Sequence, residues 1–107
     1  LVRKLCPACR LIDESEAAAG EEYKGAAVYS ASGCAQCGGI GYRGRTAIFE
    51  ILEMNDQIRE MIIEGCSPLL IRRKAVESGM KTLRRAAVEK VRAAITSIEE
   101  IDRVTFE

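Results

Sequence analysis

The chain has 107 residues, a length that suits one domain or a fragment of a larger protein. Hydrophobic residues make up 48% and charged residues 30% of it, a composition that excludes wholesale disorder. Lys plus Arg and Asp plus Glu number 16 each, and this neutrality gives no general argument for nucleic acid or an anionic membrane as a partner.

Residue types and segments that the sequence lacks further restrict the kinds of site and the location that it can have. The chain has no histidine, which removes the usual acid–base residue near neutral pH and every mixed Cys/His metal site. No apolar run approaches the roughly 20 residues that span a bilayer, so no transmembrane segment is predicted. Residues 1–5 are too short and too charged for a signal peptide. We therefore expect residues 1–5 to be the cut end of a longer chain. With no export signal, we expect the protein to be in a reducing cytosol.

The first half of the chain predicts short elements around a glycine-rich loop. Asp13 is placed to cap a helix over residues 14–22, with acidic residues near its start. Residues 26–31 predict a short strand. After the loop, residues 46–52 are β-branched and apolar on both sides, which predicts a strand buried on most of both faces.

The second half begins with signals for two short helices. Asn55 is a good N-cap residue, and the helix that it begins is expected to stop at Gly65. Ser67 and Pro68 open the next helix, because proline is favoured at the first helical position. Gly79 is expected to close this second helix.

Two more helices are predicted before the end of the chain. Thr82 starts a third helix whose apolar positions continue to Ile95. Ser97 followed by Glu100 fits the capping-box pattern, a hydroxyl residue with a glutamate three positions on. This pattern predicts a last short helix from Ser97 to about Arg103.

The expected fold class is α+β. Residues 1–45 are predicted to be a small tetracysteine zinc-binding lobe with short strands. Residues 46–107 are predicted to be a strand plus a helical C-terminal subdomain of three to four short helices.

The clearest chemical signal is a pair of C-x-x-C motifs separated by residues 10–33. A structural zinc ion is held by four ligands in a tetrahedron, and each motif supplies two thiolates on one side of the ion. The sequence therefore predicts one structural zinc with the ligands Cys6, Cys9, Cys34 and Cys37. A redox dithiol, an iron–sulfur cluster or four ordinary thiols are the alternatives. Cys66, the fifth cysteine, has no partner motif and is expected to be a free thiol.

The glycine-rich loop also fits a nucleotide-binding pattern. Residues 39–44 match G-x-G-x-x-G, but the dinucleotide loop follows a strand and opens a helix, whereas this stretch is expected to open a strand. We therefore predict a tight turn. Arg43 and Arg45 flank it without a firm assignment, either as a solvated or salt-bridged pair or as a contact for an acidic partner or a phosphate.

Three stretches resemble a known family. "LVRKLCPACR", "YSASGCAQCGGIGYRGRTAIFEIL" and "GMKTLRRAAVEKVRAAITSIEEIDRVT" are similar to the C-terminal region of the secretion ATPases of type II secretion and type IV pilus assembly. The resemblance covers nearly the whole chain, and its cysteine and C-terminal motifs are specific.

The resemblance implies a parent protein that is a cytoplasmic homo-hexameric ATPase, peripheral to the bacterial inner membrane. Such a protein couples ATP-driven motion to an inner-membrane platform and to other secretion or pilus assembly proteins. Its ATP and Mg²⁺ sites lie upstream of this chain. The four cysteines match the family's tetracysteine positions, and no catalytic or cofactor-binding residue maps here. We therefore expect that the fragment by itself is not an enzyme.

Two rival functions and two departures from the family remain. A nucleic-acid-binding zinc ribbon requires a basic face, which a neutral chain does not predict, and a thiol redox module requires an exposed thiolate of low pKa.

Ala86–Ala87 and Ala94 stand where family members often have Asp-Gly and Gly. Because alanine favours helix over glycine by roughly 1 kcal/mol, a straighter and more stable third helix is expected. Residues 10–33 are expected to form a projecting, metal-clipped lobe.

Overall fold

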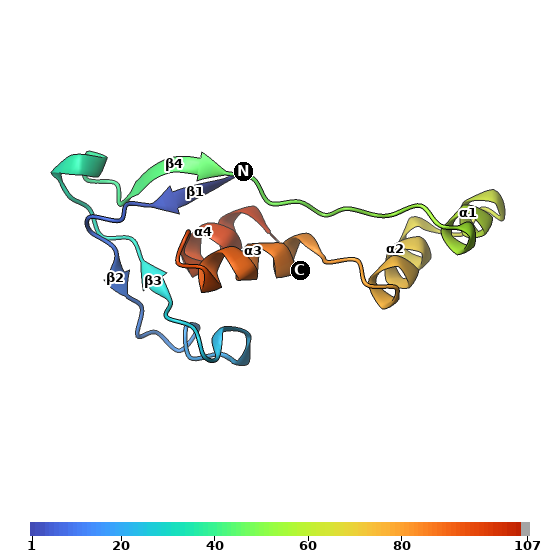
Figure 1. Ribbon diagram of the computed structural model, residues 1–107, viewed down its shortest axis with the longest axis horizontal. Coiled ribbons are helices and arrows are strands. Elements are labelled where there is room, and N and C mark those ends of the chain that lie inside the picture. Colours follow the sequence, from blue (N-terminus) through green and yellow to red (C-terminus); the bar gives the residue numbers. More distant parts are fainter. Residues whose placement is uncertain (106–107) are drawn as a thin grey trace. The chain divides into compact units, whose positions relative to one another are not determined.

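A computed structural model gives the fold, and it describes residues 1–105. Within these residues the fold is α+β, as predicted, with short strands and four helices (Figure 1). The strands are β1 (Val2–Leu5), β2 (Leu11–Ile12), β3 (Tyr29–Ser30) and β4 (Tyr42–Thr46), and the helices are α1 (Asp56–Ile63), α2 (Pro68–Glu77), α3 (Leu83–Arg92) and α4 (Ile98–Val104). None of the helices in residues 1–105 has the length and apolar character needed to cross a membrane.

The contacts group the chain into two compact units. One comprises Leu1–Ile48 together with Leu83–Glu107, and the other comprises Phe49–Thr82. These limits differ from those of the two predicted segments, because α3 and α4 share a unit with the N-terminal strands. Each unit is described by itself below.

The first unit is built on the antiparallel pair β1 and β4, which lie side by side in Figure 1. Val2 pairs with Thr46 and Arg3 with Arg45, and an irregularity follows before Leu5. α4 packs against β1, and α3 packs against α4. The buried core consists of aliphatic side chains and one tyrosine: Val2, Tyr23, Val28, Ala87, Val88, Val91, Ile98 and Ile101.

The segment between the two cysteine motifs differs from the prediction in its secondary structure and its packing. No helix forms over residues 14–22; turns precede a short 3₁₀ helix, η1 (Glu21–Tyr23). The Asp13 carboxylate accepts from the Ser15 N–H at 2.9 Å, and such local bonds compete with helix formation. The predicted strand over 26–31 shortens to β3, which pairs with β2. These residues do not form a separate projecting lobe, because Tyr23 belongs to the core of the unit.

The predicted strand over residues 46–52 is wrong in its position. β4 begins at Tyr42 and ends at Thr46. The pairing with β1 ends at Thr46, which lies opposite Val2. Phe49 and Ile51, predicted to be buried, are 66% and 69% exposed.

The third helix ends earlier than predicted, at Arg92. Ala94 lies beyond that end with a φ of 64°, and it is the one residue other than glycine with a positive φ within residues 1–105. The expectation that alanine at this position favours the helix is therefore wrong, because the left-handed conformation favours glycine. Ile95 follows the helix, and its N–H donates to the carbonyl of Lys90 at 3.0 Å.

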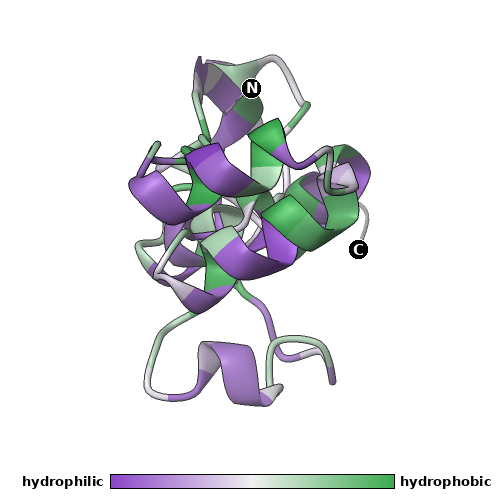
Figure 2. Ribbon diagram, turned by 90° about the vertical axis from the view of Figure 1, so that its right-hand side faces the viewer, coloured by the Kyte–Doolittle hydropathy of each residue, from purple (hydrophilic) through white to green (hydrophobic). Residues whose placement is uncertain are grey.

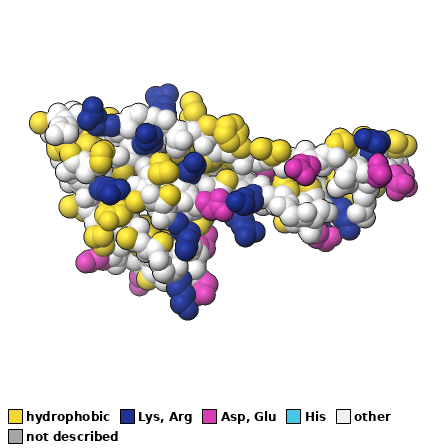
Figure 3. All heavy atoms as spheres, viewed as in Figure 1, with side chains coloured by type: hydrophobic (Ala, Val, Ile, Leu, Met, Phe, Trp, Pro, Cys, Tyr) yellow, Lys and Arg dark blue, Asp and Glu magenta, His cyan; other side chains and the backbone are white. Residues whose placement is uncertain are grey.

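The second unit contains the helices α1 and α2, and their predicted beginnings are confirmed. Asn55 caps α1 by accepting from the N–H of Ile58 at 2.8 Å, and Ser67 caps α2 ahead of Pro68. Ile58 and Ala75 are buried in this unit. Figure 2 shows green hydrophobic and purple hydrophilic stretches along the helices, and in Figure 3 yellow apolar side chains stand on the surface of this unit.

Candidate metal centre

The structure brings the two C-x-x-C motifs together. The sulfur atoms of Cys6, Cys9, Cys34 and Cys37 all lie within 4.8 Å of one another. The Sγ–Sγ distance is 3.8 Å for each of the pairs Cys6–Cys34, Cys9–Cys37 and Cys34–Cys37. Four sulfurs at 2.3 Å from one tetrahedral zinc ion are separated by about 3.8 Å. The donor set therefore fits a tetrahedral thiolate site.

Each motif is a tight turn at the end of a strand or in a short helix. Cys6 directly follows β1, and the N–H of Arg10 donates to its carbonyl at 3.2 Å. Cys37 lies in the 3₁₀ helix η2 (Ala35–Cys37). Its sulfur accepts from the N–H of Cys34 at 3.2 Å. Each motif is thus held in its turn by a bond from a backbone N–H group.

Gly41 links the motifs through its backbone. Its carbonyl accepts from the N–H of Cys6 at 2.9 Å, and its own N–H donates to Sγ of Cys37 at 3.2 Å. The φ of Gly41 is 85°, and a Cβ placed on it would lie 2.7 Å from Cβ of Ala31. Only glycine therefore fits this position. The loop continues into β4 and not into a helix, which agrees with the prediction of a turn rather than a phosphate loop.

Two of the four thiols, those of Cys9 and Cys37, differ in acidity when no metal is bound. Burial alone would raise the pKa of Cys37, but the backbone N–H groups of Cys34 and Gly41 outweigh it and lower the pKa to about 6. Burial, with the neighbouring thiols, raises the pKa of Cys9 to about 12. The thiols therefore do not all ionise together unaided. A bound dication would offset part of the negative charge of four thiolates and so favour their ionised forms, which is the electrostatic role of a metal here.

The donor set restricts the chemistry of the centre. It contains sulfur only, since the chain has no histidine and the cluster contains no carboxylate. Four thiolates around one ion leave no open coordination position, so the arrangement suits a structural metal and not a catalytic one. Cys66 is outside the cluster; it lies in the Phe49–Thr82 unit, and its N–H donates to the carbonyl of Met61 at 3.0 Å.

The two arginines of the glycine-rich loop are exposed on β4. Within residues 1–105, neither Arg43 nor Arg45 makes an ion pair or a side-chain hydrogen bond. Arg45 lines an open hollow of about 410 Å³ together with Arg3 and Arg103. The structure thus favours solvated side chains over a salt-bridged pair.

Sequence reasoning did not predict the contacts that hold the centre against the rest of its unit. The Arg10 guanidinium lies over the ring of Tyr29, 4.3 Å from the centroid, and donates to the carbonyl of Ala94 at 3.0 Å. Arg92 donates to the carbonyls of Glu22 and Lys24 at 3.0 and 2.9 Å. These bonds join residues 68 to 84 positions apart, and no local pattern in the sequence marks them.

Comparison with known proteins gives a match over almost the whole chain. The model of the family described as "Type II/IV secretion system protein" matches residues 1–103. The chain is 39% identical to the type IV pilus assembly ATPase PilB of Thermus thermophilus, with 100% of this chain and 13% of that protein covered. It is 42% identical to the type II secretion system protein E of Klebsiella pneumoniae, with 98% of this chain and 22% of that protein covered.

A third relative is similar in coverage. The chain is 35% identical to the type II secretion system ATPase E of Vibrio cholerae, with 100% of this chain and 22% of that protein covered. The chain thus spans between 13% and 22% of the length of these three relatives.

Proposed function

The chain belongs to the type II/IV secretion system protein family, and on that premise we propose that it is the C-terminal region of an assembly ATPase. The observation that carries the proposal is the match over residues 1–103 to proteins named as type II secretion and type IV pilus ATPases. The small share of those relatives that the chain covers supports a longer parent protein.

The four clustered cysteines hold one structural zinc ion in this proposal. The Sγ–Sγ distances of 3.8 Å support it, together with the absence of any nitrogen or oxygen ligand in the cluster. An iron–sulfur cluster would use the same four thiolates, and a metal assay distinguishes the two. The division into a zinc-binding lobe of residues 1–45 and a strand plus helical C-terminal subdomain of residues 46–107 remains a proposal, and the core that α3 shares with Tyr23 and Val28 couples the two.

The zinc-stabilised region has a mechanical role in the parent protein. ATP and Mg²⁺ bind upstream of Leu1, in a cytoplasmic homo-hexamer at the inner membrane. The C-terminal region passes the ATP-driven motion to an inner-membrane platform and the assembly proteins around it. Two contacts support transmission of force through this unit: Arg10, which follows Cys9, donates to the carbonyl of Ala94, and Arg92 of α3 donates to the carbonyl of Glu22.

The 107-residue chain has no catalytic activity of its own in this proposal. The test compares it with the parent protein in an ATP hydrolysis assay, alongside a measurement of zinc per chain. We expect hydrolysis by the parent only and one zinc in each protein. Hydrolysis by the 107-residue chain would contradict the proposal. Iron in place of zinc would contradict the metal assignment, and tight salt-dependent binding of DNA or RNA would favour a nucleic-acid-binding ribbon.

A further inference from the structure

The two strands β1 and β4 place two arginines directly opposite each other. Arg3 of β1 pairs with Arg45 of β4 in the antiparallel register. Side chains in such a pair have Cβ atoms about 5 Å apart, and like charges at that position destabilise a sheet. Within residues 1–105, no carboxylate forms an ion pair with Arg45 to offset the repulsion. The fold thus retains a charge repulsion that a bound anion would relieve.

A third arginine joins this pair. Arg45 and Arg3 line an open hollow of about 410 Å³ together with Arg103, which comes from α4. The other lining residues are Leu1 and Val2, so none of the described residues that line the hollow is acidic. Three separate elements of the first unit therefore contribute an arginine to one open space, named here the arginine hollow.

Glu100 holds two of these arginines in place. Arg3 donates to its carboxylate from Nε and Nη2 at 3.1 and 2.9 Å, and Arg103 donates from Nε and Nη2 at 3.0 and 2.8 Å. The guanidinium of Arg3 also lies over the ring of Tyr42, 4.3 Å from its centroid. Both guanidinium groups are therefore positioned before any ligand arrives, which lowers the entropy cost of binding one.

The buried carboxylate does not neutralise the arginine hollow. The Glu100 side chain has no exposed surface, whereas the side chains of Arg3 and Arg103 are 40% and 56% exposed. Within the described residues, Nη1 of each of these two arginines makes no hydrogen bond. Three positive charges stand against the single negative charge of Glu100, which leaves a net charge of +2. Free donors and this charge match a dianion with several acceptor oxygens.

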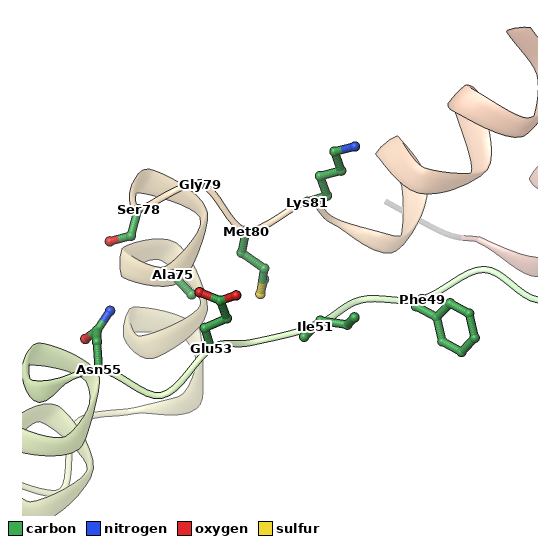
Figure 4. Close-up of a pocket in the computed structure, with 9 residues that line it drawn as sticks. All are labelled: Phe49, Ile51, Glu53, Asn55, Ala75, Ser78, Gly79, Met80 and Lys81. Carbon is green, nitrogen blue, oxygen red and sulfur yellow. The ribbon is translucent and has the colours of Figure 1, made fainter.

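Two hollows on the Phe49–Thr82 unit lack such an excess of charge. One has a volume of about 390 Å³, and Figure 4 shows that Glu53 and Lys81 are its charged lining residues, one of each sign. The other has a volume of about 320 Å³ and is lined by Glu50 and Arg72, which form an ion pair at 2.7 Å. Of these three hollows, the arginine hollow is the one suited to an anion.

We propose that the arginine hollow binds a dianionic phosphate group, either inorganic phosphate or the phosphate of a monoester. A guanidinium donates two parallel hydrogen bonds to phosphate oxygens, a geometry that lysine does not provide. A phosphate group offers three terminal oxygens and nearly two negative charges, so it uses three guanidinium groups more fully than a carboxylate does. The inference goes beyond the proposed function and uses residues of the first unit only.

Nuclear magnetic resonance of the zinc-loaded 107-residue chain tests the proposal. The chain is acetylated at its N-terminus, because Leu1 lines the arginine hollow and a free amino group would add a cation. Inorganic phosphate is added at about pH 8, where it is a dianion, with sodium chloride keeping the ionic strength constant. We expect saturable shifts of the Nε–H signals of Arg3, Arg45 and Arg103. Acetate should bind at least about 10-fold more weakly.

Arg45→Gln removes one guanidinium and leaves the bonds to Glu100 intact. We expect this variant to bind phosphate at least about 10-fold more weakly. Arg43→Gln is the matched control, because Arg43 is exposed on the same strand and does not line the arginine hollow. Its affinity should stay within about twofold of that of the unsubstituted chain. An unchanged thermal midpoint shows that each variant keeps its fold.

Three outcomes would overturn the proposal. Shifts that grow linearly with phosphate and never saturate would mean general charge screening. Equal losses of affinity in Arg45→Gln and Arg43→Gln would place the binding outside the arginine hollow. Equal affinities for acetate and phosphate would exclude a phosphate-specific site. Within the proposal, glycerol 3-phosphate distinguishes the two sources: affinity equal to that of inorganic phosphate supports a monoester as the ligand, and binding of inorganic phosphate alone supports the free ion.

Discussion

The carboxylate of Glu100 accepts hydrogen bonds from both the main chain and the side chain of Arg3, a residue 97 positions earlier in the sequence. The N–H of Arg3 donates to Oε2 at 2.7 Å, and its guanidinium donates to Oε1 at 3.1 and 2.9 Å. Arg103 donates to the same carboxylate at 3.0 and 2.8 Å. The Glu100 side chain has no exposed surface, so one buried carboxylate joins β1 to α4.

Replacing this carboxylate by an amide should destabilise the first unit. We expect Glu100→Gln to lower the free energy of unfolding by about 2 kcal/mol, because the amide loses charge-assisted hydrogen bonds from the two half-exposed guanidinium groups. Urea unfolding of the purified chain measures the change. Glu99→Gln is the matched control, since Glu99 is exposed on the same helix, and its effect should stay within about 0.5 kcal/mol. Equal effects of the two variants would contradict a structural role for the buried carboxylate.

The Glu100 carboxylate should also make the fold less stable in acid. Burial would raise the pKa of Glu100, but hydrogen bonds from Arg103 and Arg3 outweigh it and lower the pKa from 4.5 to about 2. A carboxyl with a lowered folded-state pKa stabilises the fold above its unfolded-state pKa, and this contribution is lost as the pH falls toward the folded-state value. The free energy of unfolding should therefore fall between about pH 4.5 and pH 2.

The Glu100→Gln variant separates this effect from a loss of the metal in acid, which is expected because metal binding requires deprotonated ligands. Its free energy of unfolding should fall less steeply between about pH 4.5 and pH 2 than that of the unsubstituted chain, because the variant lacks the titrating group. Parallel pH profiles for the two proteins would show that other groups, such as the metal ligands, account for the acid sensitivity.

Ala94→Gly should stabilise the chain, although alanine is the better helix former. Ala94 has a φ of 64°, and this left-handed conformation costs an alanine about 1 kcal/mol. We expect the midpoint of thermal unfolding to rise. Ala93→Gly is the control, because Ala93 lies one position earlier and its N–H still donates to the carbonyl of Glu89 at 3.0 Å. There glycine should lower the midpoint. A fall with both variants would mean that Ala94 carries no conformational strain.

The features that the sequence predicted correctly are those that depend on neighbouring residues. Asn55 and Ser67 cap their helices through bonds to residues three positions on, so a short stretch of sequence contains the whole signal. The spacing within each C-x-x-C motif likewise predicted two thiols in one turn, and the structure brings the two motifs together.

The features that were missed depend on residues distant in the sequence. Ser97 caps α4, as its pattern predicts, but the Glu100 carboxylate binds Arg3 and Arg103 where a capping box would have it turn back to the Ser97 backbone. Residues 46–52 have the composition of a strand, yet pairing ends at Thr46. The composition therefore indicated that residues 46–52 favour the β conformation, whereas the length of the paired strand depends on β1, its partner.

Removal of the metal should unfold the cysteine-bearing part of the first unit. We expect chelation, or Cys34→Ser, to release one zinc per chain and to unfold residues 6–45, because metal binding and folding are coupled when a site is formed by distant turns. α3 should also lose helical signal, since it packs against the same core as Tyr23 and Val28. Elemental analysis and far-ultraviolet circular dichroism measure the two effects.

Cys66→Ser is the control for the metal experiment, because Cys66 belongs to the Phe49–Thr82 unit and lies outside the cluster. This variant should keep its zinc and its thermal midpoint. Loss of zinc from Cys66→Ser would overturn the ligand assignment. An unchanged spectrum and midpoint after chelation, with zinc shown to be gone, would instead mean that the backbone bonds around Gly41 suffice to hold the two cysteine turns together.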